Sequence, residues 1–172
     1  MHYHNRERNV HLPVVRAVRK ALKGQQTVYI VGKGPSLDDL TKEDFDEFPN
    51  APIICINESV HAIEKLDIHT DRLFCIQHDL MNNINRPKRA QWLLSEYSWQ
   101  DQQGDYSKDI RYDRLEICQD KPNLTVCVAL SLSSLAGANQ AVMLAFDAAF
   151  AGDCNYASSI NRTHHLEDQD DN

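Results

Sequence analysis

The stretch TVYIVGKGPSLDDL, residues 27–40, decides the fold that the sequence predicts. Residues 27–31 are β-branched or apolar, are too few for a helix and stop at a glycine, which predicts a buried strand. After a glycine loop, Ser36 is suited to cap a helix, with Asp39 three residues further on. The stretch therefore predicts a strand, a loop and a helix in succession.

The rest of the chain repeats this alternation. Strands are expected over residues 53–56, 73–76 and 124–130, with a short one over 115–118. Helices are expected over 10–22, 58–66 and 87–99, and another follows the serine-rich turn 131–134 to about residue 150. Because strands that alternate with helices form parallel sheets covered on both faces, the predicted fold is α/β, a Rossmann-like three-layer sandwich with a mainly parallel sheet.

Length and composition predict a single domain and a cytoplasmic location. The chain has 172 residues, 42% of them apolar, which predicts a single α/β domain over 1–172 with flexible ends at 1–10 and 163–172. No apolar run approaches the roughly 20 residues of a membrane span, and the amino terminus is too polar for a signal peptide, so we expect a cytoplasmic protein. The five cysteines are expected to be buried, reduced thiols.

The charge distribution indicates which kinds of partner the protein is expected to bind. A formal charge of −7 argues against broad nucleic-acid binding, which requires a basic surface. Residues 1–24 are nevertheless basic, and the tail after Arg162 is acidic. Two interpretations stay open, a solvated basic helix with a frayed acidic tail, or a basic arm that holds an anionic partner.

Polar residues directly after the predicted strands are the candidate site. In an open parallel sheet, ligands bind beyond the carboxyl ends of the strands, where loops and helix starts converge. The residues found there are Gly32, Lys33, Gly34, Pro35, Ser36, Asn57, Glu58, Gln77, His78, Asp79, Ser131, Ser133 and Ser134.

These residue types suit a nucleotide. Glycines let the backbone approach a ligand, and a helix start offers N–H groups to a phosphate, to which Lys33 would add a positive charge. Asn57 and Gln77 carry the donors and acceptors that a base or sugar needs, and Asp79 is suited to a ribose hydroxyl, to Mg²⁺ or to the role of a base.

Each candidate also has a purely structural interpretation. The Gly-x-Gly turn is also explained by tight geometry, and Asn57, Asp79, Ser133 and Ser134 are all residue types that cap helices or form turns. Histidines such as His78 often pack in a core or lie on the surface without taking part in catalysis. The loop is neither a Walker A motif nor the dinucleotide fingerprint, because its spacing and its glycine count differ from both.

The segment 28–37 resembles the opening of a superfamily that joins bacterial sialyltransferase-like glycosyltransferases with pterin diphosphokinase-like archaeal proteins of unknown-function family 115. The matching residues are Gly32, Gly34, Pro35, Ser36 and Leu37, then Cys55-Ile56-Asn57, then Ser133-Ser134 before the alanine-rich stretch 136–141. The resemblance implies a Rossmann-like fold that binds the CMP part of a CMP-sugar, or ATP. It also implies that the glycine loop and Asn57 contact the nucleotide, with Ser133 and Ser134 near the phosphate or sugar.

Two features of that superfamily lack a clear counterpart. Its members usually follow the alanine-rich helix with an apolar strand ending in Gly-x-Asp, for which 152–160 is a weak candidate here. The sialyltransferases also carry a histidine base in a lid region, and His164 and His165 lie in a polar tail that does not match it.

The sequence therefore predicts a nucleotide-binding transferase, glycosyltransferase-like, that uses a nucleotide-sugar of the CMP-sugar type. In this hypothesis Asp79 or His78 deprotonates an acceptor hydroxyl. One alternative is a Mg²⁺-dependent diphosphotransferase that acts on a pterin-like alcohol, with Asp79 holding the metal. Another is a non-catalytic nucleotide-binding or assembly module, such as a homo-oligomer that buries its first helix.

Overall fold

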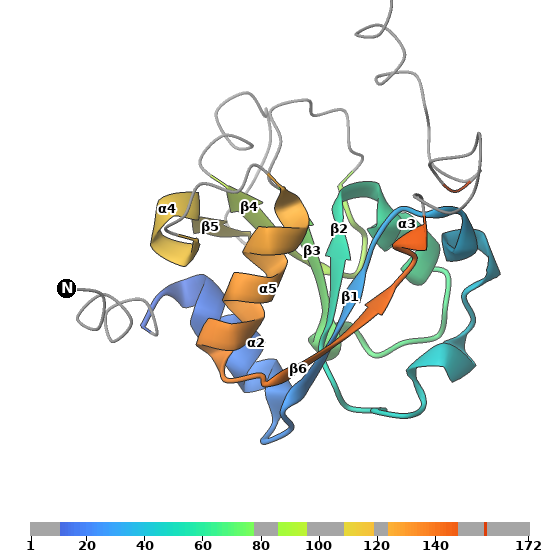
Figure 1. Ribbon diagram of the computed structural model, residues 1–172, viewed down its shortest axis with the longest axis horizontal. Coiled ribbons are helices and arrows are strands. Elements are labelled where there is room, and N and C mark those ends of the chain that lie inside the picture. The colour runs from blue at the N-terminus through green and yellow to red at the C-terminus, as the bar shows by residue number, and fades with distance from the viewer. Residues whose placement is uncertain (1–10, 78–85, 96–108, 119–123, 148–156, 158–172) are drawn as a thin grey trace, which may run out of the picture.

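The computed structural model describes residues 11–77, 86–95, 109–118, 124–147 and 157, and it contains one six-stranded sheet in which every pairing is parallel (Figure 1). Along the sheet the order is β5-β4-β3-β2-β1-β6. The strands are β1 (Thr27–Val31), β2 (Ile53–Ile56), β3 (Leu73–Gln77), β4 (Gln91–Ser95), β5 (Ile110–Tyr112) and β6 (Gln140–Leu144). The predicted α/β class is confirmed.

Strand β1, which lies between β2 and the border strand β6, shows how the sheet divides the core into two layers. All five of its residues are buried, as expected for a strand covered on both faces. Val28 and Ile30 belong to one core cluster, and Tyr29 and Val31 belong to the other, because successive side chains of a strand point to opposite faces.

Helices cover both faces of the sheet, as predicted. On one face lie α2 (Pro13–Leu22), α5 (Thr125–Ala136) and the short α4 (Arg114–Ile117) (Figure 1). The other face is covered by shorter elements, η1 (Pro35–Asp39), η2 (Lys42–Phe45) and α3 (Val60–Ile63). Two further single turns are η3 (Asn57–Ser59) and η4 (Thr70–Arg72).

The strand order reverses between β1 and β6. From β1 the sheet grows through β2, β3 and β4 to β5, and the chain then returns through α5 to add β6 on the free side of β1. Since parallel crossovers are right-handed, a step in the reverse direction places its helix on the opposite face, which is where α5 lies. Such a reversal is the point at which open α/β sheets bind ligands.

The strand expected over 124–130 is wrong, because that segment belongs to helix α5. Its buried residues are Thr125, Val128, Ala129, Leu132, Ser133 and Ala136, which recur at helical spacing. The helix ends at Gly137, whose left-handed φ of 106° suits a glycine C-cap. The helix expected to continue to about residue 150 is also wrong, since the chain enters β6 at Gln140.

Two other segments have the opposite secondary structure from the one expected. The helix expected over 87–99 contains β4, and the strand expected over 115–118 is the helical turn α4. Before β4, the backbone N–H groups of residues 88–90 all donate to the carboxylate of Glu64. The guanidinium of Arg89 donates to the carbonyls of Glu64, Leu66 and Ile68. These contacts with the end of α3 hold the chain extended where it enters the sheet.

Helix α2 is buried within its own subunit. Val14, Val15 and Val18 are fully buried against the sheet and α5. The apolar face of α2 is thus covered by the chain itself, and the homo-oligomer that buries this helix stays a prediction that only its exposed face, with Arg16 and Lys20, could serve. No helix in the described part of the chain has the length and apolar character that a membrane crossing requires.

Candidate functional site

The glycine loop packs directly against the end of β6 at the reversal of strand order. Gly32 N–H donates to the Leu144 carbonyl at 2.8 Å, and Gly34 N–H donates to the Ala145 carbonyl, also at 2.8 Å. A Cβ atom on Gly32 would overlap the Ala145 carbonyl oxygen, and one on Gly34 would overlap the Asp147 carboxylate. Both glycines are therefore required by the close approach of two backbone segments, whatever the ligand.

Asp147 clamps the start of η1. Its Oδ2 accepts the backbone N–H of Ser36 at 3.1 Å, and its Oδ1 accepts the Ser36 hydroxyl at 2.8 Å. The Ser36 hydroxyl bond is the main reason that the pKa of Asp147 lies below its ordinary value of 3.8. A carboxylate of the protein thus lies at the helix start where the sequence predicted a ligand phosphate.

The predicted N-cap role of Ser36 is wrong. Helix η1 is a 3₁₀ turn of five residues whose N-cap is Gly34, and no side chain caps it. The Leu37 N–H donates to the Gly34 carbonyl at 2.9 Å. The N–H groups of Gly32, Gly34, Ser36 and Leu37 thus all donate to acceptors within the protein. A phosphate would have to displace Asp147 to reach the Ser36 amide.

Lys33 links the ends of β1 and β2. Its Nζ lies 3.1 Å from Glu58 Oε2, and the two side chains are only 14% and 30% exposed. The Lys33 carbonyl accepts the N–H of Ala157, a fully buried residue, at 2.9 Å. Lys33 therefore presents its charge at the carboxyl ends of the strands, which we call the carboxyl edge, already paired with a carboxylate.

Asn57 follows β2 in a left-handed conformation, with φ 51°. Asparagine is one of the few residues other than glycine that adopts this conformation readily. The residue is only 6% exposed, and its side-chain Oδ1 meets no hydrogen-bond donor among the described residues. No side chain caps η3, which begins at Asn57, so the capping interpretation of this residue is wrong. A buried acceptor without a donor costs roughly 1–3 kcal/mol, which a ligand donor would recover.

Gln77 ends β3 at the same edge. The residue is fully buried, and its backbone carbonyl accepts the Tyr112 hydroxyl at 3.2 Å, which ties β3 to β5. Because β1, β2 and β3 are adjacent, the structure places Gln77, Asn57 and the glycine loop along one edge. His78 and Asp79, predicted to act as bases, lie outside the described residues.

The predicted position of Ser133 and Ser134 near the phosphate is wrong. Both lie in the last turn of α5, where the Ser133 hydroxyl donates to the Ala129 carbonyl at 2.7 Å and Ser134 is exposed. The chain then passes to Asn139, whose N–H donates to the Gln26 carbonyl just before β1. These serines therefore lie at the opposite edge of the sheet from the glycine loop.

Sequence reasoning missed Asp147. The resemblance implies an apolar strand followed by Gly-x-Asp, for which the sequence offers 152–160 as a weak candidate. In the structure, β6 ends at Leu144 and is followed by Ala145-Phe146-Asp147, and Ala145 has φ 57°, a conformation that favours glycine. A strand expected over 140–144 would have made Asp147 one of the candidate site residues, because these were chosen as the residues that follow the predicted strands.

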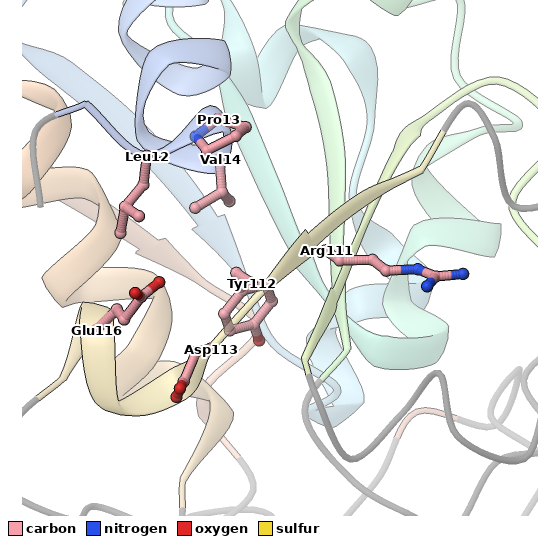
Figure 2. A pocket seen from close by; sticks show the side chains of 7 residues that line it. All are labelled: Leu12, Pro13, Val14, Arg111, Tyr112, Asp113 and Glu116. Atoms are coloured by element: carbon pink, nitrogen blue, oxygen red, sulfur yellow. The ribbon is translucent and has the colours of Figure 1, made fainter.

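A separate pocket of about 250 Å³ lies at the start of α2, beside β5 and α4 (Figure 2). Leu12, Val14 and Tyr112 form its apolar wall, and Asp113 and Glu116 place carboxylates at its margin. Tyr112 connects it to the carboxyl edge through its bond to Gln77. None of the residues predicted to form the site lines this pocket.

The Ser36–Asp147 clamp predicts a pH-dependent effect. Since the pKa of Asp147 is lower in the folded protein than its ordinary value, the clamp stabilises the fold above about pH 3.8, and this contribution is lost as the pH falls through the lowered pKa. Ser36→Ala should therefore destabilise the protein at neutral pH, and the difference from wild type should shrink in acid. Urea unfolding at several pH values measures it, and the exposed Ser134→Ala is the control. A difference that does not change with pH would contradict the clamp.

The described residues hold no group of three metal-ligating side chains. In the described part of the carboxyl edge, the groups available for chemistry are amides, the Lys33–Glu58 ion pair, the clamped Asp147 carboxylate and backbone groups. Comparison with known proteins adds no relative, since no family model, no curated protein and no solved structure matches this chain.

Proposed function

We propose that this protein is a nucleotide-binding transferase of the glycosyltransferase type, which takes a nucleotide-sugar such as a CMP-sugar at the carboxyl edge. The observation that supports this most is the buried Asn57 side chain, whose Oδ1 has no donor among the described residues. It lies at the end of β2, next to β1 and the reversal of strand order. A ligand that donates a hydrogen bond to this oxygen would satisfy it.

The amide of Asn57 favours a ligand with both donors and acceptors. Its Oδ1 accepts and its Nδ2 donates, which matches the edge of a nucleobase or a pair of sugar hydroxyls. Gln77 offers a second amide one strand away. Two amides on neighbouring strands would recognise a neutral, planar polar group rather than a phosphate.

Phosphate recognition would fall to Lys33. The Asp147 carboxylate already holds the Ser36 amide, so a phosphate approaching η1 would meet a negative charge. Lys33 supplies a cation at this edge, and a phosphate would draw it away from Glu58, its partner at 3.1 Å. Binding of an anion therefore requires the Lys33–Glu58 pair to open or to be shared.

In the proposed transfer, an acceptor hydroxyl oxygen attacks the anomeric carbon of the sugar. The bond from that carbon to the nucleotide phosphate oxygen breaks, and the hydroxyl proton passes to a base. His78 and Asp79 directly follow Gln77 in the sequence and are our proposed bases. A second candidate, a non-catalytic nucleotide-binding or assembly module, is favoured by the internal use of the loop N–H groups.

The test is the affinity of Asn57→Gly for a panel of CMP, CDP, UDP, GDP, ATP and a CMP-sugar, with and without Mg²⁺, by calorimetry. Glycine keeps the left-handed backbone and removes only the amide. We expect the variant to bind at least about tenfold more weakly, equivalent to about 1.4 kcal/mol. Asn139→Gly, the same substitution at the other edge of the sheet, should leave the affinity unchanged.

The panel also separates the alternatives. Tight CMP binding without metal supports the glycosyltransferase, and binding that needs Mg²⁺ supports the diphosphotransferase. If no nucleotide binds wild type, or if Asn57→Gly binds as tightly as wild type, the proposed site is wrong.

A further inference from the structure

Strand β6 forms one border of the sheet, and the described residues leave its outer side unpaired (Figure 1). It is much less buried than the inner strands, since Gln140 and Met143 are exposed, whereas every residue of β1, β2 and β3 is buried. Met143 is 40% exposed, and Phe146, just beyond the strand, is 37% exposed. Among the residues that the structure describes, an apolar strand therefore has no neighbour along one side.

Within the described ranges, the strand carries none of the usual protection of a sheet edge. Proteins discourage edge pairing with charges, prolines, bulges or a covering element. The sequence QAVML has no charge and no proline, and its register with β1 runs without a bulge from Gln140 to Leu144. Helix α5 packs mainly over β1, β2 and β3. By contrast, β5 at the other border has only three residues and carries the exposed Arg111.

The free backbone groups of β6 can be identified. The Leu144 carbonyl accepts from Gly32, and the Gln140 N–H donates to the Gln26 carbonyl, so both residues point their backbone groups toward β1. Because this direction alternates along a strand, Ala141 and Met143 point theirs outward. The open edge thus offers two N–H groups and two carbonyls.

We infer that β6 pairs with β6 of a second copy of this chain, antiparallel, with Val142 on the two-fold axis. Residue 141 then lies opposite residue 143 of the partner subunit, on both sides of the axis. A directly opposed pair of this kind exchanges two hydrogen bonds, so the two pairs use all the outward groups of both strands. A two-fold axis makes the interface self-complementary and closes it at two copies.

The chemistry of the strand favours a second copy over the chain's own carboxyl-terminal tail. Self-pairing of QAVML places no like charges opposite each other, which would be destabilising. Residues 158–172 are polar and acidic and hold few residues with a preference for strands. Ala157, the one described residue beyond Asp147, donates its N–H to the Lys33 carbonyl in the loop after β1, and not to a backbone group of β6.

Pairing through β6 would join the two sheets into one. Because the strands run antiparallel across the axis, the two carboxyl edges face opposite ways, and each candidate site stays open. The inference is independent of the proposed function, since it rests on the outer side of β6 and not on Asn57 or Lys33.

The first test is the mass in solution, measured by sedimentation over a dilution series. Wild type should sediment at twice the chain mass of 19.7 kDa. Met143→Lys puts a charge on the exposed edge and should raise the dimer dissociation constant at least about tenfold. Ala141→Pro removes an outward N–H that β1 does not use, so it should also give monomers while circular dichroism shows an intact fold.

The second test determines the register between the two paired β6 strands. In Val142→Cys the two new thiols face each other across the axis at a non-hydrogen-bonded pair, where the Cα atoms are about 4.5 Å apart, within the range of a disulfide. Mild oxidation should give a covalent dimer. Met143→Cys is the control, because residue 143 lies opposite residue 141 of the partner subunit and should not cross-link. A monomeric wild type, a dimer that survives both Met143→Lys and Ala141→Pro, or equal cross-linking of both cysteine variants would overturn the inference.

Discussion

Replacing Leu132 with alanine is expected to lower the free energy of unfolding by about 3 kcal/mol, within the range of 2–5 kcal/mol for buried leucines. Leu132 is fully buried on α5, in the core cluster that joins this helix to α2 and the sheet. The substitution removes apolar contacts and leaves a cavity that close-packed neighbours fill only in part. Urea unfolding followed by circular dichroism measures the change.

Leu130→Ala is the matched control. It lies two residues away on the same helix and is 40% exposed, so its loss should change the free energy of unfolding by no more than about 0.5 kcal/mol. In a strand, residues two apart point to the same face, whereas in a helix they point to opposite sides. Similar costs for the two variants would therefore contradict the helical assignment of this segment.

The second large effect is expected at Gly32. Gly32→Ala should lower the free energy of unfolding by about 2–3 kcal/mol, because the added methyl group meets the Ala145 backbone, which cannot turn away as a side chain would. For a chain of this length that corresponds to a fall in Tm of very roughly 4–12 °C. Scanning calorimetry of both proteins measures it.

Gly137→Ala separates steric overlap from backbone strain. Gly137 has a φ of 106°, but a Cβ atom there meets nothing within 4 Å. It should cost about 1 kcal/mol through the left-handed backbone alone. If Gly32→Ala proves no more costly than this control, the loop does not pack on the end of β6.

The packing of the glycine loop affects how binding experiments are designed. A side chain at Gly34 would meet Asp147 and the Ala145 carbonyl, and would therefore disturb the clamp on Ser36 as well as any ligand. Loss of binding in Gly34→Val would then have two explanations. Asn57→Gly avoids this problem, because it removes a side chain without adding one.

The sequence alone predicted the elements whose local pattern is distinctive. β1, β2 and β3 are continuous apolar runs of four or five residues, too short for helices, and each appears where expected. Helix α2 shows clear helical spacing of its valines. From these elements followed the parallel sheet and a loop at its carboxyl edge, since the direction of the strands fixes which residues follow them.

The sequence did not separate α5 from β6. Apart from Asn139 and Gln140, the stretch from Leu124 to Leu144 is apolar or small, and such a run fits a buried helix and a buried strand equally well. The neighbours of each part decide its secondary structure. The sheet and α2 pack against α5, whereas β6 pairs with β1.

The parallel α/β sheet and the glycine loop after its first strand follow from the amino-acid sequence alone, because a strand of five apolar or β-branched residues that stops at a glycine is a local pattern. The contacts of that loop, in contrast, depend on the tertiary fold. Ser36 meets Asp147 across 111 residues of sequence, and both glycines fit because β6 lies beside β1. Local preferences specify the strands and helices, whereas the partner of a polar group depends on the order in which the strands assemble, and no short stretch of sequence encodes that order.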